Sequence, residues 1–230
     1  MTKIFCDIAD KDLIKKFNKK KIVKGFTTNP SLMRKAGATN YKSYSLRILK
    51  ITKKPISLEV FADNEKDMIN QGFKISEWGK NVYVKVPVCN SKGKFMGKVI
   101  STLNEKKIKL NITAVYNHNQ TKKILQKINK KTKVIISIFA GRMADVGKDP
   151  IPVFEKSLKL SKKFKNVEIL WASTREPYNL QQAKKLNCHI ITVPPNIIEK
   201  IENFGTSFNT LSVKTVRGFL IDSKKSKFTI

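Results

Sequence analysis

The feature that most constrains the fold is the alternation of short apolar runs with longer amphipathic stretches along the whole chain. The strand-like runs lie near residues 3-7, 22-27, 56-62, 82-88, 108-116, 133-139, 167-173 and 189-194. Between them, apolar residues recur at helical spacing. This order favours parallel strands covered by helices. Eight such units in 230 residues predict a closed α/β barrel.

The same alternation continues to the end of the chain without a break. No linker rich in Pro, Gly or Ser and no low-complexity segment interrupts it, so we expect one domain over residues 1-230. One more amphipathic stretch, Asn209 to Asp222, follows the helix expected near Asn196 to Phe204. The predicted fold class is therefore α/β, a single (β/α)8 TIM barrel with an additional C-terminal helix.

Lys85 is a charged residue in a segment, Val82 to Val88, that otherwise reads as a buried strand. Alternate residues of a strand point to opposite faces, and the even-numbered valines form one face suited to covering helices. Lys85 then points into the barrel, where a low dielectric lowers the pKa of a lysine. A neutral amine there can form a Schiff base with a carbonyl substrate. The alternative is an edge strand whose lysine faces water.

The same alternation places polar side chains from other strands inside the barrel. Asp7, Glu59, Asn111, Thr113 and Ser137 are all expected to point inward, with Phe139 beside them. Each lies near the C-terminal end of its strand, where barrel enzymes keep their active sites. Burying so many polar groups without partners would cost several kcal/mol. A functional cavity is the simpler explanation for the whole set, although for a single inward Ser or Thr a hydrogen-bonded core residue is the better explanation.

The chain is strongly basic, with a net charge of +30 and a pI of about 10.1. Charge of this sign suits nucleic acid, an anionic surface or acidic small molecules as partners. The lysines fall on expected helices and loops all around the barrel, which indicates a solvated outer face and no specific nucleic-acid partner. A non-catalytic, basic, nucleic-acid-binding barrel remains the alternative from a second functional class.

Other residues indicate the compartment and the absence of a metal. Cys6, Cys89 and Cys188 are odd in number and lack CxxC spacing, which favours a reducing compartment. The charged N-terminus is no signal peptide, and no apolar run reaches the ~20 residues of a membrane helix. We therefore expect a cytoplasmic protein without membrane contact. His118 and His189 lie on different units, so neither a metal site nor a cofactor is expected.

Several short motifs lie near the ends of the expected strands. The segment from Gly25 to Leu32 reads G-F-T-T-N-P-S-L, and V-K-V-P surrounds Lys85. They are followed by Asn111-Ile112-Thr113, Gln120, Ser137-x-Phe139-x-Gly141-Arg142-x-x-Asp145 and Ala172-Ser173-x-Arg175. In this order and spacing, the motifs resemble the transaldolase family, which includes the fructose-6-phosphate aldolases. The chain departs from the family's pattern at Val88-Cys89-Asn90 and at Tyr116-Asn117, which bears on substrate range. The resemblance implies a class I aldolase-type barrel.

The resemblance also implies a role for each motif residue. The catalytic residues it implies are Lys85, Asp7, Glu59 and Thr113. The substrate-binding residues it implies are Thr27, Asn29, Asn111, Ser137, Phe139, Arg142, Ser173 and Arg175. The lysine would form an imine with the C2 ketone of a ketose phosphate, and the two arginines would bind the phosphate.

Two positions bear on which reaction the family member performs. As the family is known, transaldolases carry Glu and Phe where fructose-6-phosphate aldolases carry Gln and Tyr, and this chain has Glu59 and Phe139. We therefore expect a transaldolase that transfers a dihydroxyacetone unit from fructose 6-phosphate or sedoheptulose 7-phosphate to an aldose phosphate. The alternative is a fructose-6-phosphate aldolase-type lyase. The small size resembles a highly oligomeric subfamily, so a homo-oligomer is expected.

Overall fold

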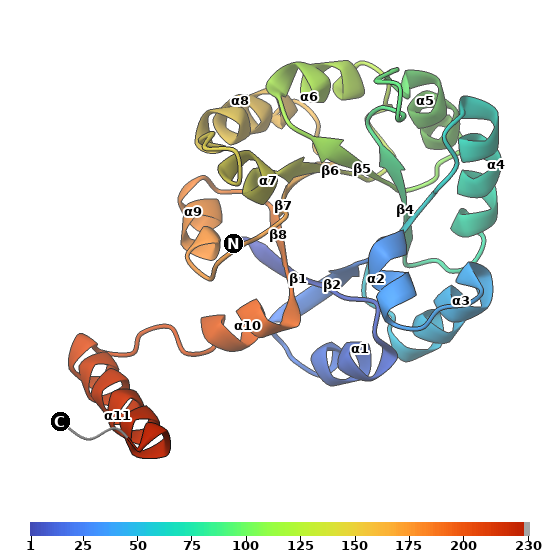
Figure 1. The fold of residues 1–230 in the computed structure, drawn as a ribbon. Helices are drawn as coiled ribbons and strands as arrows, with labels where there is room; N and C mark the ends of the chain where they lie inside the picture. The colour runs from blue at the N-terminus through green and yellow to red at the C-terminus, as the bar shows by residue number, and fades with distance from the viewer. Residues whose placement is uncertain (228–230) are drawn as a thin grey trace.

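The chain forms a closed barrel of eight parallel strands that follow one another in sequence order. The computed structural model describes residues 1–227. Figure 1 looks along the barrel axis, with helices surrounding the strands. The strands are β1 (Lys3–Asp7), β2 (Val23–Thr27), β3 (Ile56–Glu59), β4 (Val82–Pro87), β5 (Leu110–Val115), β6 (Val134–Phe139), β7 (Val167–Ala172) and β8 (Ile190–Val193). The predicted TIM barrel is thus confirmed.

Among residues 1–227, the helices follow the strands in sequence order, and all but the last cover the outside of the barrel. They are α1 (Lys11–Asn18), α2 (Pro30–Lys35), α3 (Tyr41–Ile51), α4 (Glu65–Ser76), α5 (Gly97–Glu105), α6 (His118–Leu125), α7 (Ala140–Ala144), α8 (Ile151–Ser161), α9 (Asn179–Lys185), α10 (Pro195–Ile201) and α11 (Phe208–Ser226). Asn and Asp side chains cap several of them; Asn117 and Gln120, for example, form a capping box at the start of α6.

Strand alternation separates two apolar layers. Val82, Val84 and Val86 of β4 belong to the large cluster between the strands and the helices. Phe5 and Tyr83 belong instead to a small cluster inside the barrel, with Ile135, Leu170, Ala172 and Ile190. This inner cluster fills part of the barrel with side chains, so the polar inward residues collect at the C-terminal end of the strands.

The expected strand boundaries agree with the structure to within a few residues. The largest difference is β3, which was expected to reach residue 62 and ends at Glu59. In β5 the pairing with β6 shifts between Ile112 and Val115, and Ala114 has a positive φ of 60°. This irregularity interrupts the alternation, so Val115 joins the outer cluster although Thr113 points inward.

The additional C-terminal helix is present as α11, which includes the expected stretch from Asn209 to Asp222. It stands clear of the barrel in Figure 1, and none of its residues is buried. Phe208, Phe219 and Leu220 are among its exposed apolar side chains. Within residues 1–227, no helix combines the length and the apolar character needed to cross a membrane.

Candidate active site

A cavity of about 200 Å³ opens at the C-terminal end of the barrel strands. Its lining residues are Asp7, Thr27, Asn29, Lys85, Asn111, Thr113, Ser137, Phe139, Arg142, Ala172, Ser173, Arg175 and Thr192. They come from β1, β2, β4, β5, β6, β7 and β8, from the loops that follow β2 and β7, and from α7, which follows β6 directly. The sequence places only one lysine on the inner face of this end of the barrel, and that residue is Lys85.

Lys85 lies deep in the cavity, with only 7% of its surface exposed. Its Nζ is 3.0 Å from Oε2 of Glu59 and donates a hydrogen bond of 3.0 Å to the carbonyl oxygen of Thr28. The ion pair follows from sheet register, because Glu59 of β3 pairs directly with Lys85 of β4. Glu59 therefore compensates the buried ammonium and is the nearest acceptor for its proton.

Asp7 faces the same cavity from the end of β1. Its Oδ1 accepts a hydrogen bond of 2.6 Å from the Thr27 hydroxyl, and the Oγ1 atoms of Thr27 and Thr192 are also 2.6 Å apart. Burial raises the pKa of the Asp7 carboxyl, and the positive charge of Lys85 and the Thr27 hydrogen bond only partly oppose that rise. A buried carboxylate of raised pKa is suited to accept a proton from a bound hydroxyl group.

A chain of neutral hydrogen bonds crosses the cavity floor. The Asn111 side-chain amide donates to Oγ of Ser57 at 2.9 Å, and its carbonyl oxygen accepts from the Ser137 hydroxyl at 2.7 Å. All three residues are buried. Because each end of the amide is fixed by a neighbour from another strand, Asn111 presents a fixed dipole to any ligand in the cavity.

Thr113 differs from these neighbours in its hydrogen bonding. Its Oγ1 is buried, and no protein group among residues 1–227 hydrogen-bonds to it. Buried hydroxyls in folded proteins are nearly always hydrogen-bonded to protein, water or ligand. Thr113 lines the cavity, so a molecule bound there is the natural partner for its hydroxyl.

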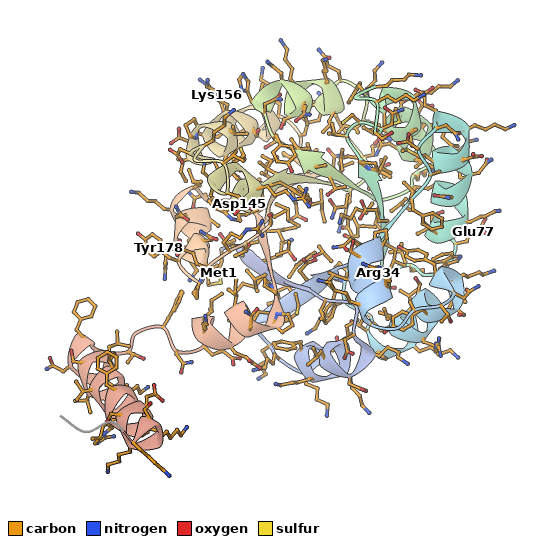
Figure 2. The ribbon with its side chains drawn as sticks, in the orientation of Figure 1. Met1, Arg34, Glu77, Asp145, Lys156 and Tyr178 are labelled. Atoms are coloured by element: carbon orange, nitrogen blue, oxygen red, sulfur yellow. The ribbon has the colours of Figure 1, made fainter. Side chains whose placement is uncertain are left out.

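Two arginines lie at the mouth of the cavity. Arg142 is in α7, directly after β6, and its guanidinium lies 5.8 Å from the ring centroid of Phe139. Arg175 follows β7, and its Nε and Nη2 donate to the two carboxylate oxygens of Asp145 at 3.0 and 2.5 Å. Figure 2 shows Asp145 beside α7. This hydrogen bond holds the pKa of the Asp145 carboxyl below its usual range.

Helix α7, which carries Arg142, is packed directly against the loop that carries Arg175. A Cβ built on Gly141 would lie 1.7 Å from the carbonyl oxygen of Ser173 and 3.0 Å from Cγ of Arg175. Ser173 itself has a positive φ of 63°, a conformation that costs energy for any residue other than glycine. Only glycine at position 141 allows this approach.

The structure brings together the residues that the sequence singled out. Eleven of the twelve line the cavity, and Glu59, the twelfth, reaches it through its ion pair with Lys85. Asn29 has a second function, because its side chain caps α2. Sequence reasoning missed Thr192, which the alternation of β8 could have shown, since Ile191 and Val193 pack outward. Gln120 lies outside the cavity lining and accepts backbone hydrogen bonds instead.

Comparison with known proteins identifies the family. The model of the Transaldolase/Fructose-6-phosphate aldolase family matches residues 4–229. The chain belongs to this family. A "Probable transaldolase" of Nitrosopumilus maritimus is 34% identical over 201 residues, covering 86% of each chain. Proteins with the same description from Methanococcus maripaludis and Herpetosiphon aurantiacus are 31% and 30% identical, covering 87% and 96% of this chain and 90% and 94% of theirs.

Solved structures with similar folds support the architecture alone. Inosine 5'-monophosphate dehydrogenase from Legionella pneumophila matches with a TM-score of 0.57 at 11% identity, covering 83% of this chain and 57% of that one. N-acetylneuraminate lyase from Mycoplasma synoviae matches with a TM-score of 0.55 at 11% identity, covering 82% and 68%. At such identities the shared feature is the barrel. The assignment of an aldolase-type activity rests on membership of the transaldolase/fructose-6-phosphate aldolase family.

Proposed function

We propose that this aldolase-type enzyme is a transaldolase that transfers a dihydroxyacetone unit between sugar phosphates through a Schiff base. The donor is fructose 6-phosphate or sedoheptulose 7-phosphate, and the acceptor is an aldose phosphate. The observation that carries the proposal is the buried Lys85, with a carboxylate 3.0 Å from its Nζ and a second carboxylate, Asp7, in the same cavity. A family that holds both transaldolases and aldolases supports the same chemistry.

The first half of the reaction makes the imine. Nζ of Lys85, after giving a proton to Glu59, attacks the C2 ketone, and the resulting carbinolamine loses water to form the imine. That step needs a proton donor for the departing hydroxyl group. Glu59 lies within hydrogen-bonding distance of Nζ, and the unpartnered Thr113 hydroxyl faces the same space, so these two groups move the protons, with a bound water between them.

The second half breaks and remakes a carbon–carbon bond. Asp7 takes the proton of the C4 hydroxyl, the C3–C4 bond breaks, and its electron pair moves into the protonated imine to give a neutral enamine. The aldose leaves, and C3 of the enamine then attacks the aldehyde carbon of the acceptor, whose oxygen takes the proton back from Asp7. Hydrolysis of the new imine releases the product and frees Lys85. The raised pKa of Asp7 keeps its proton affinity high for this exchange.

Neutral and cationic groups of the cavity hold the substrate. Asn111 and Ser137 already form one hydrogen-bonded unit, and Thr27, Asn29 and Ser173 stand around it as further contacts for the hydroxyl groups. Holding the three-carbon unit rigidly favours re-addition over loss. Arg142 and Arg175 bind the terminal phosphate at the mouth, where Arg175 must exchange its carboxylate partner for the substrate.

Borohydride trapping tests the imine. Reduction in the presence of fructose 6-phosphate should add one reduced three-carbon unit to Lys85, located by peptide mass mapping. Lys85→Met should lose both labelling and turnover. Lys24→Met is the matched control, because Lys24 also lies on a strand but is exposed. Labelling that persists in Lys85→Met would show that the assigned nucleophile is wrong.

Glu59 and Phe139 favour the transferase over the lyase. A transaldolase must keep its enamine until an acceptor arrives, so protonation and hydrolysis have to be slow. The Phe139 ring lines the cavity and has no acidic proton to donate, whereas a tyrosine hydroxyl could protonate the enamine or activate water. The runner-up, a fructose-6-phosphate aldolase, would release dihydroxyacetone without an acceptor.

Product analysis separates the two activities. With fructose 6-phosphate alone, the enzyme should release little dihydroxyacetone, and erythrose 4-phosphate should produce sedoheptulose 7-phosphate much faster. Phe139→Tyr should shift the balance toward free dihydroxyacetone, whereas Phe139→Leu, which adds no hydroxyl group, should not. Release of dihydroxyacetone by the wild type as fast as transfer would make the protein an aldolase.

The proposal extends to the working state of the enzyme. The three cysteines are free thiols, which suits a reducing compartment such as the cytoplasm, where we expect the enzyme to work.

We also propose a homo-oligomer in which α11 packs on a second copy, because residues 1–227 bury none of its apolar side chains and the barrel exposes Val146 and Tyr178. Light scattering of Phe219→Glu should then report a smaller particle than the wild type. An unchanged mass would contradict this packing.

A further inference from the structure

A second and larger hollow lies at the end of the barrel opposite the candidate active site. Its volume is about 1100 Å³. The walls are formed by α8 and by the three loops that lead into β6, β7 and β8. Those loops meet the N-terminal ends of the strands, whereas the catalytic cavity lies at the C-terminal ends. We call this hollow the basic groove, and nothing in the proposed reaction uses it.

The basic groove is lined mainly by lysines. Eight of its 18 lining residues are lysine and two are glutamate. Lys130, Lys131 and Lys133 come from the loop before β6, and Lys162 and Lys165 come from the loop before β7. All five are exposed. The whole chain holds 47 Lys and Arg in 230 residues, so the groove concentrates positive charge beyond the average for the chain.

Most of these lysines have no carboxylate to neutralise them. Within residues 1–227, the only ion pair among the lining residues joins Lys3 to Glu168. Convergent like charges repel one another, and a concave surface focuses their potential. A bound anion would remove that cost, so the arrangement favours an anionic occupant over an empty, solvated surface.

The layout of the groove favours an extended anion over a single phosphate group. The lysines stand on separate loops along the hollow, and its lining contains no arginine that could grip one phosphate with two parallel hydrogen bonds. Phe164 adds a half-buried ring to the wall, with Nζ of Lys130 5.8 Å from the ring centroid. Spaced ammonium groups beside an aromatic ring match a chain of repeating charges.

We propose that the basic groove binds a linear chain of phosphates, at a site separate from catalysis. Two sources share this chemistry, single-stranded nucleic acid and inorganic polyphosphate. Lysine ammonium groups contact phosphate oxygens and do not read bases, so binding is independent of nucleotide sequence and weakens steeply with salt.

Charge removal inside and outside the groove tests the proposal. The probe is a fluorescein-labelled (dT)20 oligonucleotide, followed by anisotropy between 50 and 200 mM NaCl. The groove variant is Lys131→Gln/Lys162→Gln/Lys165→Gln. The matched control, Lys15→Gln/Lys42→Gln/Lys66→Gln, loses the same charge from exposed positions on α1, α3 and α4. Melting temperatures establish that both variants are folded.

The groove variant should bind the probe about tenfold more weakly at 100 mM NaCl, with the control close to wild type. Removing three phosphate contacts should also lower the slope of log affinity against log salt by about 2, since each contact on a single strand contributes ~0.7. Equal weakening in the two variants would overturn the proposal, because it would assign binding to overall charge. Failure of the wild type to bind at 50 mM NaCl would overturn it as well.

Competition identifies the source of the phosphates. Unlabelled polyphosphate that displaces (dT)20 at equal phosphate concentration supports recognition of phosphate alone. If only unlabelled (dT)20 displaces the probe, the bases contribute to binding. Phe164→Ala should then weaken the binding of (dT)20 and leave the binding of polyphosphate unchanged. Either competition result supports binding in the basic groove only if the groove variant also binds the probe more weakly than the control variant. Duplex DNA should show no sequence preference that survives physiological salt.

Discussion

Thr27 and Thr113 provide a matched pair, because both hydroxyls lie in the catalytic cavity but only that of Thr27 is hydrogen-bonded to the protein. Both are buried on strands at the same end of the barrel, and both line the catalytic cavity. Thr27 makes two hydrogen bonds of 2.6 Å, one of them to the Asp7 carboxylate, whereas no protein group bonds to the Thr113 hydroxyl. Replacing each by valine keeps the β-branched shape and exchanges the hydroxyl group for a methyl group.

The structure sets opposite expectations for the stability of the two variants. Thr27→Val loses a bond to a charged group and a neutral one, together worth roughly 2–4 kcal/mol. For a chain of this length that corresponds to a melting temperature lower by about 5–15 °C. Thr113→Val loses no bond to protein, and a buried hydroxyl without a partner costs about 1–3 kcal/mol. Its melting temperature should stay the same or rise.

Turnover should fall in Thr113→Val even though the stability of this variant does not. Loss of a group that moves protons in imine formation lowers turnover by about 100-fold or more. Differential scanning fluorimetry and a coupled assay of transfer to erythrose 4-phosphate measure the two quantities on the same samples. If Thr113→Val melts as low as Thr27→Val, its hydroxyl has a structural partner. If it keeps full turnover, Thr113 takes no part in proton transfer.

Three other predictions address the carboxylate, the arginines and the absence of a metal. Because Asp7 has a raised pKa in the folded state, its ionisation destabilises the fold as pH rises through that value; Asp7→Asn should lose turnover yet melt above wild type at pH 8, and a gap that widened toward pH 4 would contradict this sign. Arg142→Ala and Arg175→Ala should each raise KM for phosphorylated donors at least about tenfold, since a charge-assisted hydrogen bond contributes ~1.5–3 kcal/mol; unchanged kinetics in the two variants would place the phosphate elsewhere. EDTA should leave turnover unchanged, because the Lys85 amine activates the ketone, and inactivation by the chelator would argue for a metal mechanism.

The fold was predictable because the alternation of apolar and polar residues within each strand shows which side faces the helices. An apolar even-numbered face on β4, with a lone lysine on the odd-numbered face, requires cover on one side and a polar lumen on the other. The same rule places Asp7, Asn111 and Ser137 inside, and the family resemblance adds the loop residues. Alternation fails only where the backbone leaves the regular strand, as at Ala114, and no residue type marks that position in advance.

The electrostatic partners were less accessible to sequence reasoning. The pairing of Lys85 with Glu59 depends on the register between β3 and β4, which alternation alone does not fix. The pairing of Arg175 with Asp145 depends on two loops that are 30 residues apart in the chain. The basic groove depends on the convergence of three loops, so lysines that appear evenly spread along the sequence gather at one place.

Because of the contact between Gly141 and the Ser173 carbonyl, α7 and the loop after β7 can be expected to change only together during evolution. Any side chain at position 141 would push the β7 loop away and move Arg175 with it. Replacing only one of these two segments by that of a relative would therefore lose the close contact between them. Protein engineers who seek a new substrate terminus should transplant residues 140–145 and 173–176 together, and recombination between them should be selected against even where each loop alone is compatible with the barrel.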